Sequence, residues 1–231
     1  MNIQGYQKLT LLDFPGKVAC TVFTGGCNLR CPFCHNASLV LSPREGENKE
    51  EEVLSYLLAR KGILEGVCIT GGEPILQPDL ASFVEKVKRM GYAVKLDTNG
   101  SDPVALSALL EKGGIDYIAM DMKSSPENYT KAIGKEIPFD RFFESVSVIR
   151  SSKIPYEFRT TVVKGIHTEE DMEGIGRFLG KEEKYFLQGF VDSGNLLGKG
   201  YEAFSAKEMS DFLKVIRKYN PGAQLRGQEG E

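Results

Sequence analysis

The sequence lacks the features that mark membrane-spanning and nucleic-acid-binding proteins. No stretch reaches the ~20 consecutive apolar residues of a membrane helix, and residues 1–12 lack the basic start and apolar block of a secretory leader. The 29 Lys and Arg residues nearly balance the 32 Asp and Glu residues, and the basic residues are scattered along the chain. We therefore expect a cytoplasmic protein that binds neither membrane nor nucleic acid.

Cysteines are few and unevenly placed. Three of the five fall within eight residues, and none follows Cys68. An odd, clustered set does not match a secreted disulfide framework, whereas three neighbouring thiols are typical of metal ligands in a reducing compartment. We interpret Cys20 and Cys68 as buried structural thiols, a reading that suits Cys27, Cys31 and Cys34 less well because polar and charged residues surround them.

Short apolar runs alternate with longer stretches of helical period, which indicates repeated βα units. With 231 residues, the chain can bury one sizeable core, and no linker divides it. We predict an α/β fold, a partial (β/α)6 barrel of TIM type forming a single domain over residues 1–231, with 221–231 as a flexible tail. The predicted strands are 17–24, 66–70, 92–97, 115–122, 156–163 and 185–190, and the predicted helices are 50–60, 79–90, 103–111, 139–150, 169–179 and 206–218.

Four consecutive predicted strands end in polar or metal-binding residues, at the rim where parallel βα folds carry their sites. The cysteine loop follows the first strand and Gly-Gly-Glu-Pro (71–74) the second; Asp-Thr-Asn-Gly (97–100) ends the third, and Asp121 and Lys123 end the fourth. Taken singly, each motif has a structural reading, since glycine pairs form turns and a lysine can be a solvated cation. Their shared position predicts one site.

The spacing of Cys27, Cys31 and Cys34 suits a [4Fe–4S] cluster held by three thiolates instead of the usual four. Three ligands leave one iron open to a substrate or cofactor, just as a catalytic zinc site keeps one coordination position open. Zinc is the rival metal, and it would need a fourth ligand from a histidine or one of the separate cysteines. Structural zinc sites more often use a second pair of closely spaced cysteines, which this chain lacks.

Together these motifs resemble the radical S-adenosylmethionine superfamily. Leu-Asp-Phe-Pro-Gly (12–16) and Cys-His-Asn (34–36) further resemble its glycyl-radical-enzyme activating branch, in particular the activating proteins of anaerobic ribonucleoside-triphosphate reductase. The resemblance implies that S-adenosylmethionine binds the open iron and is cleaved by one electron to methionine and a deoxyadenosyl radical. It implies that this radical takes a Cα hydrogen from a glycine of the partner reductase, with a flavodoxin or ferredoxin-type protein as electron donor.

The resemblance also implies roles for single residues. It makes Cys27, Cys31 and Cys34 the cluster ligands and the catalytic centre, and Asp97, Thr98 and Asp121 a site for a monovalent cation. Cofactor contacts are expected from Phe33, His35, Gly72, Glu73, Asn99, Lys123, Arg159 and Gln188. Gln188 stands where some activating enzymes carry a histidine, so its contact is a hypothesis. We expect His167 to be an exposed residue at a helix start.

Two other functions stay open from the sequence. A small-molecule radical enzyme such as 7-carboxy-7-deazaguanine synthase shares the three cysteines and the Gly-Gly-Glu-Pro segment, although residues 13–16 and 35–36 favour the activating branch. A non-catalytic zinc or redox-sensing domain would use the three thiolates as structural ligands. The metal content of the purified protein separates this last reading from the others.

Overall fold

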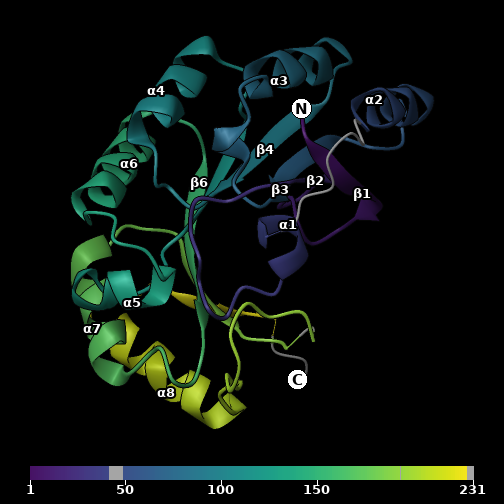
Figure 1. Cartoon of the computed structure of the whole chain (residues 1–231). Coiled ribbons are helices and arrows are strands. Elements are labelled where there is room, and N and C mark those ends of the chain that lie inside the picture. The colour runs from purple at the N-terminus through teal and green to yellow at the C-terminus, as the bar shows by residue number, and fades with distance from the viewer. Residues whose placement is uncertain (42–48, 193, 228–231) are drawn as a thin grey trace. The chain divides into compact units, whose positions relative to one another are not determined.

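A computed structural model describes residues 1–41, 49–192 and 194–227, and it divides into two compact units that we treat separately (Figure 1). The first unit comprises residues 1–28, 38–119 and 141–155, and the second comprises 29–37, 120–140 and 156–231. The chain passes from one to the other within strand β5 (Tyr117–Asp121), whose last two residues belong to the second unit. This division does not test the expected single domain over 1–231, which stays a prediction.

The first unit contains strands in the order β1-β2-β3-β4-β5. Strand β1 (Ile3–Thr10) is antiparallel to β2 (Ala19–Thr24), whereas β2, β3 (Gly66–Gly71) and β4 (Ala93–Thr98) are parallel. In the register, Thr24 lies beside Gly71 and Ile69 beside Leu96, so the three parallel strands end at one edge. The sequence analysis did not predict β1, because its mostly half-buried and exposed residues show no clear alternation.

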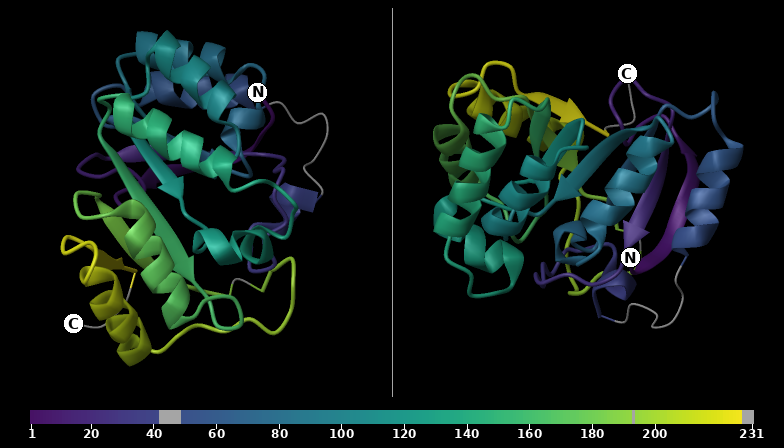
Figure 2. Two further views of the ribbon diagram at one scale, coloured as in Figure 1. Left: turned by 90° about the vertical axis from the view of Figure 1, so that its left-hand side faces the viewer. Right: turned by 90° about the horizontal axis from the view of Figure 1, so that it is seen from above.

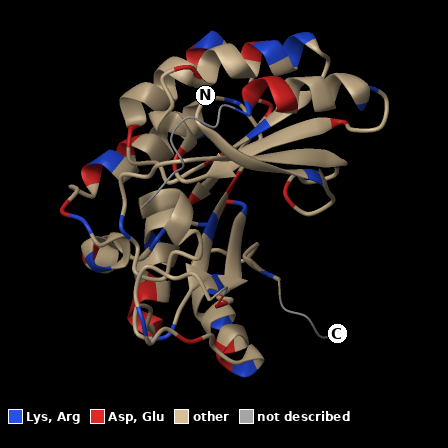
Figure 3. Ribbon diagram, turned by 45° about the vertical axis from the view of Figure 1, so that its right-hand side comes forward, with Lys and Arg blue, Asp and Glu red and all other residues tan. Residues whose placement is uncertain are grey.

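The helices of the first unit lie between and after these strands along the chain. They are α1 (Ala37–Leu41), α2 (Glu50–Ala59), α3 (Leu80–Arg89), α4 (Pro103–Lys112), α6 (Asp140–Ser151) and a 3-10 turn at Pro74–Leu76. Acidic residues fill the first turn of α2 and basic residues the last turn of α3, as the helix dipole favours (Figure 3). Lys86 of α3 bonds Glu50 of α2 at 2.6 Å and joins the two helices.

The second unit contains parallel strands β6 (Tyr156–Val162), β7 (Tyr185–Gly189) and β8 (Gln224–Arg226). Its helices are α5 (Tyr129–Ile133), α7 (Glu169–Leu179), α8 (Ala206–Arg217) and a 3-10 turn at Pro126–Asn128. Figure 2 shows α7 and α8 side by side along this sheet. Both helices begin with a reciprocal capping box, which satisfies backbone donors that a helix start leaves unpaired.

The predicted flexible tail is wrong for residues 224–226, which form β8 beside β7. Glu157 supplies the physical reason, because its fully buried carboxylate needs a cationic partner. Arg226 meets it with two hydrogen bonds of 2.6 and 3.0 Å and lays its guanidinium 3.7 Å from the centre of the Phe186 ring. The last part of the predicted tail, 228–231, lies outside the described residues.

All six predicted strands and all six predicted helices are present, and their ends agree with the structure within two residues. The βα alternation of the predicted α/β fold is therefore confirmed. In the described ranges, no helix combines the length and the apolar character that crossing a bilayer demands.

Candidate active site

In the first unit, the loop before the cysteines is built against the Gly-Gly-Glu-Pro segment. The N–H of Gly72 donates to the Thr24 carbonyl, and the N–H of Glu73 donates to the Gly26 carbonyl, each at 2.8 Å. A Cβ atom on Gly72 would overlap the Gly26 carbonyl oxygen. Glycine is therefore required here by the close approach of two backbones.

Glu73 joins the loops that follow β3 and β4. Its side chain, which is 1% exposed, accepts from the Thr98 hydroxyl at 2.7 Å and from the Asn99 N–H at 2.6 Å. The N–H of Ile75 also donates to this carboxylate, at 3.2 Å. The buried Glu73 carboxylate thus holds the loops after β3 and β4 together. A direct contact of Gly72 or Glu73 with a cofactor stays a prediction.

Asn99 connects the loop after β4 to the first cysteine. Its side-chain Nδ2 lies 3.7 Å from the Cys27 sulfur and 3.1 Å from the Asn28 Oδ1. The residue is 5% exposed, so its amide is held away from bulk water. The structure therefore places Asn99 beside a predicted cluster ligand, and its contact with S-adenosylmethionine stays a prediction.

Asp97 has a cationic partner that the sequence analysis missed. The ammonium of Lys95, a residue 1% exposed, bonds the Asp97 carboxylate and lies 3.9 Å from the Cys68 sulfur. A monovalent cation at Asp97 and Thr98 would compete with this ammonium, and the Thr98 hydroxyl already donates to Glu73. The predicted cation site thus stays a prediction, and Lys95 offsets the charge of Asp97 without an added ion.

In the second unit, Cys31 and Cys34 lie on one tight turn, where the Cys34 N–H donates to the Cys31 carbonyl at 3.0 Å. Cys31 is buried and Cys34 half-buried. Phe33, 5% exposed, packs edge-on against the His167 ring at 5.9 Å between centres, whereas His35 is exposed. The turn therefore buries its aromatic residue and keeps the second thiol partly accessible.

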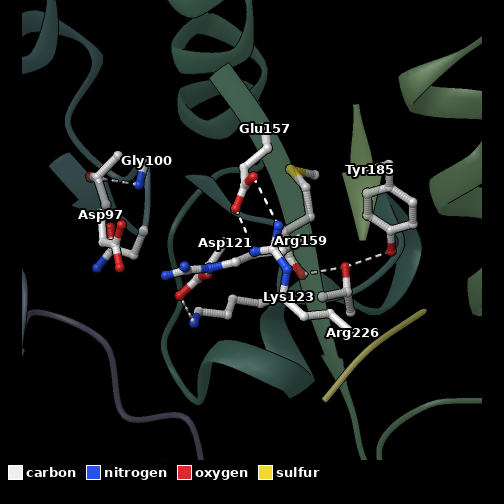
Figure 4. A network of polar contacts seen from close by, with 12 residues as sticks. Asp97, Gly100, Asp121, Lys123, Glu157, Arg159, Tyr185 and Arg226 are labelled. Carbon is white, nitrogen blue, oxygen red and sulfur yellow. Dashed lines mark hydrogen bonds and ion pairs between the residues drawn. The ribbon is translucent and has the colours of Figure 1, made fainter. Parts of the chain in front are cut away.

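Asp121 lies between two cations at the end of β5 (Figure 4). Lys123 Nζ donates to one carboxylate oxygen at 2.9 Å, and Arg159 Nε donates to the other. All three side chains are partly buried. Two cations and one carboxylate leave a net positive charge, which suits an anionic ligand group.

The pKa values of Asp121 and Lys123 keep both groups ionised. Burial raises the pKa of Asp121, but Arg159 and Lys123 outweigh burial and hold it well below the usual range. Burial lowers the pKa of Lys123, yet the Asp121 carboxylate and the Cys31 and Cys34 thiols together raise it above its usual value. Cys31 and Cys34, when ionised, thus favour the charged form of Lys123.

The expectation of an exposed His167 is wrong. The side chain is 4% exposed, and both ring nitrogens are used: Nδ1 accepts from the Val163 N–H at 3.1 Å, and Nε2 lies 2.8 Å from the Lys123 carbonyl oxygen. Since Nδ1 accepts, the ring is neutral with its proton on Nε2, which donates to Lys123. Burial lowers the pKa of His167, in agreement with the neutral form.

The last residues that the sequence analysis discussed are Gln188 and the two separate cysteines. Gln188 is half-buried on β7, level with Thr161 on one side and Arg226 on the other, and its cofactor contact stays a prediction. Cys20 and Cys68 are fully buried, as expected, and burial raises the pKa of Cys20 to about 12. Among the residues that touch predicted site residues, the sequence analysis did not single out Asn28, Lys95 and Ser101, and it gave His167 the wrong environment.

The donor set fits an iron–sulfur cluster. None of the five cysteines forms a disulfide, so no such bond competes for them. Across the described residues, no group of three or more His, Cys, Asp or Glu side chains surrounds one point, so the fit rests on donor chemistry and chain spacing. Cys27 and Cys31 are four residues apart and therefore no more than about 14 Å from each other. Soft thiolates in one short loop are the ligands that such clusters take.

Comparison with known proteins adds four findings. The family model described as Radical SAM superfamily matches residues 21–179. A Methanocaldococcus jannaschii protein named as a glycyl-radical enzyme activating enzyme is 29% identical over 99% of this chain and 97% of its own length. A Saccharolobus solfataricus protein named as a GTP 3′,8-cyclase is 33% identical over 84% of this chain and 63% of its own. The structure of Streptococcus suis SuiB bound to the precursor peptide SuiA gives a TM-score of 0.71 at 16% identity and covers 90% of this chain and 48% of SuiB.

These matches differ in how much of the relative they cover. The chain spans nearly the whole length of the first relative, but less than two thirds of the second and about half of SuiB. The likeness to SuiB, at 16% identity, shows the fold alone. Full-length correspondence thus exists with only one of these three proteins.

Proposed function

This chain belongs to the radical S-adenosylmethionine superfamily, and on that premise we propose that it generates a glycyl radical on a partner enzyme. As a member, it uses a [4Fe–4S] cluster and S-adenosylmethionine. The partner we propose is an anaerobic ribonucleoside-triphosphate reductase, and the electron donor is a flavodoxin or ferredoxin-type protein.

One observation carries the proposal. The match to the protein named as an activating enzyme covers 99% of this chain and 97% of that relative. The relatives named as GTP 3′,8-cyclases share 33, 31 and 26% identity with this chain, but only 63, 48 and 51% of their lengths are matched. The match to the cyclases is therefore partial, and the full-length match favours the activating function.

Cys27, Cys31 and Cys34 hold the cluster in this proposal. They are three thiols in one loop and outside any disulfide, and the Cys34-to-Cys31 backbone bond sets the spacing of the last two. Three thiolates leave one of four irons open for the amino and carboxylate groups of S-adenosylmethionine. The chemistry that cluster and cofactor supply when bound is one-electron cleavage of the sulfonium, which yields a radical able to take hydrogen from carbon.

The polar residues of the second unit bind the anionic part of the cofactor. Lys123 and Arg159 carry two positive charges against the single charge of Asp121, so a carboxylate finds a net positive partner there. Gln188 on β7, Phe33 and His35 contribute further contacts from the same unit. In the first unit, Asn99 and the carbonyl of Gly72 contact the cofactor, because a carbonyl oxygen accepts hydrogen bonds from an ammonium group.

No side chain needs to act as an acid or base, because the reaction moves a hydrogen atom between carbon atoms. The protein positions the cofactor near the glycine and keeps water and oxygen away from the radical. Its polar residues therefore contribute through binding and orientation.

Electron paramagnetic resonance tests the proposal directly. Reduced, reconstituted protein is mixed anaerobically with S-adenosylmethionine and the reductase from the same organism, and we expect the doublet signal of a glycyl radical. A reductase with its radical-bearing glycine replaced by alanine is the control and should give no doublet. Absence of the signal with the reductase, together with turnover of GTP or a deazaguanine precursor, would favour the small-molecule alternative.

Metal analysis tests the more distant alternative. Anaerobic reconstitution should give close to four iron and four sulfide per chain, with absorbance that bleaches on reduction. One tightly held zinc per chain instead would identify a structural zinc or redox-sensing domain and overturn the proposal.

A further inference from the structure

The Cys27 sulfur has a hydrogen-bond donor aimed at it from another loop. Asn99 Nδ2 lies 3.7 Å away, in the loop after β4, 72 residues along the chain. Both residues belong to the first unit. An amide N–H directed at a sulfur is one of the means by which proteins set the potential of an iron–sulfur cluster.

The orientation of the Asn99 amide follows from its neighbours. Its Oδ1 accepts the backbone N–H of Ser101 at 2.8 Å, and a backbone N–H can only donate. The amide therefore cannot turn over without setting two donors against each other. Nδ2, the other end, must face Cys27 and Asn28.

Asn28 closes the arrangement, and we call Asn28, Asn99 and Ser101 the amide triangle. Asn28 Oδ1 accepts from Asn99 Nδ2 at 3.1 Å, while Asn28 Nδ2 donates to the Ser101 hydroxyl at 2.8 Å. Turning the Asn28 amide would bring its Nδ2 against Asn99 Nδ2, again donor to donor. The Ser101 N–H thus fixes the Asn99 amide, and Asn99 in turn fixes the Asn28 amide.

Burial strengthens the effect of this geometry. Asn99 is 5% exposed and Ser101 is 3% exposed, so the N–H that faces Cys27 is screened little by water. Reduction adds one negative charge to a cluster and its sulfur ligands. A donor held at a ligand sulfur stabilises the reduced form more than the oxidised form.

We propose that the amide triangle directs the Asn99 N–H at the Cys27 sulfur and so raises the reduction potential of the cluster. This inference rests on the proposed function only in taking Cys27 as a cluster ligand. Asn99 contributes the donor, and Asn28 and Ser101 are positioning residues that act through it. A higher potential makes the cluster easier to reduce by a biological electron donor.

The test is a redox titration of reconstituted protein without S-adenosylmethionine or partner, followed by absorbance and by electron paramagnetic resonance. The variants are Asn99→Ala, Asn28→Ala and Ser101→Ala. Ser107→Ala is the matched control, because the Ser107 hydroxyl bonds only Glu111 on the surface of α4 among the contacts described. Iron and sulfide are counted first, so that only fully loaded samples are compared.

Asn99→Ala should lower the equilibrium constant for reduction about tenfold, which is a potential about 59 mV more negative for one electron. Asn28→Ala should shift the potential in the same direction by less, since Asn99 keeps the Ser101 N–H as an anchor. Ser101→Ala should shift it least, since it keeps that N–H and removes only the hydroxyl that holds Asn28. Ser107→Ala should match wild type. Wild-type potentials in Asn99→Ala and Asn28→Ala overturn the inference.

Three further outcomes keep the test decisive. If Asn99→Ala fails to load iron, the loaded Asn28→Ala and Ser101→Ala proteins decide, and unchanged potentials in both overturn the inference. If Asn99→Ala weakens S-adenosylmethionine binding with an unchanged potential, Asn99 is a cofactor contact only, and the inference fails while the proposed function stands. A shifted potential in a protein that forms no glycyl radical supports the inference and counts against the proposed function.

Discussion

The imidazole of His167 donates from Nε2 to the carbonyl oxygen of Lys123 at 2.8 Å, and it thereby ties the start of α7 to the lysine beside Asp121. Its other nitrogen accepts the Val163 N–H at 3.1 Å. Phe33 packs against the same ring. A histidine that the sequence suggested was exposed is therefore a buried, neutral support of the second unit.

This neutral state predicts a pH dependence of stability. The folded pKa of His167 is lowered by burial, so below about pH 6.5 the unfolded chain binds a proton that the folded chain does not. The stability that the neutral ring contributes is present above pH 6.5 and is lost as the pH falls through the folded pKa. Urea unfolding of the metal-free protein at pH 8 and pH 5.5 measures the loss.

Two variants make that measurement specific. His167→Gln should be less stable at pH 8 by about 1–3 kcal/mol, because a buried backbone group loses its partner, and it should lose part of the pH dependence. His35→Gln controls for the other histidine and should keep the part of the pH dependence that His167 contributes. Equal pH dependence in wild type and His167→Gln contradicts the assignment.

In the proposed site, three cysteines are cluster ligands and the other two are core residues. Cys27→Ala, Cys31→Ala and Cys34→Ala should each lose most of the reconstituted iron and all cleavage of S-adenosylmethionine, because each removes a thiolate that no other described cysteine replaces. Cys20→Ala and Cys68→Ala are matched controls from the buried core and should keep both. Iron and sulfide assays with product chromatography check this, and full loading of Cys34→Ala would contradict the proposed ligand set.

Gly72→Ala should disturb the cysteine loop without abolishing the fold. The added methyl would overlap the Gly26 carbonyl, so the segment that leads into Cys27 must move. We expect at least tenfold slower cleavage of S-adenosylmethionine and lower iron content. Gly5→Ala is the control, since a Cβ there meets nothing within 4 Å, and equal loss of iron in both variants would contradict a local effect.

The Lys95–Asp97 pair should behave as a buried ion pair. Lys95→Met leaves the Asp97 carboxylate, only 8% exposed, without its ammonium partner and should cost about 3–5 kcal/mol in unfolding free energy. Lys95→Met combined with Asp97→Asn should cost less than the sum of the two single changes. Urea unfolding of the four proteins completes the cycle, and additive costs would contradict the coupling.

The same variant tests the predicted cation site. If Asp97 and Thr98 can accept a monovalent cation, potassium or sodium chloride should stabilise Lys95→Met more than choline chloride at the same ionic strength. Wild type should show little difference among the salts, because Lys95 already offsets the charge. Identical salt effects in both proteins would count against a cation at this position.

Arg226→Ala should show that β8 is part of the fold. The change removes the bidentate partner of the fully buried Glu157, whose carboxylate also lies 3.9 Å from the Lys184 ammonium, and should cost about 3 kcal/mol. Arg226→Lys keeps the charge but loses the two-fold contact, so its cost should lie between those of wild type and alanine. Thermal unfolding measures the order, and a wild-type melting temperature in Arg226→Ala would contradict it.

The sequence by itself determined the regular elements and the chemistry of the site. Helical and strand periods are local, so the six predicted strands and six predicted helices are all found within two residues of their ends. The spacing of Cys27, Cys31 and Cys34 is likewise a local property of one loop. Strands β1 and β8 were not predicted, because their own residues show no strand pattern. Each becomes a strand by pairing with a neighbouring strand.

Only the tertiary structure decided which residues support the site. Asn28 meets Ser101 across 73 positions, and His167 meets Lys123 across 44, because strand ends that are far apart in the chain are close in space. The spacing of apolar residues along the chain does not indicate which distant residues will be paired. Burial was equally invisible in the sequence. Lysine and histidine are usually surface residues, but Lys95 and His167 are buried, and a buried polar group needs a hydrogen-bonding partner.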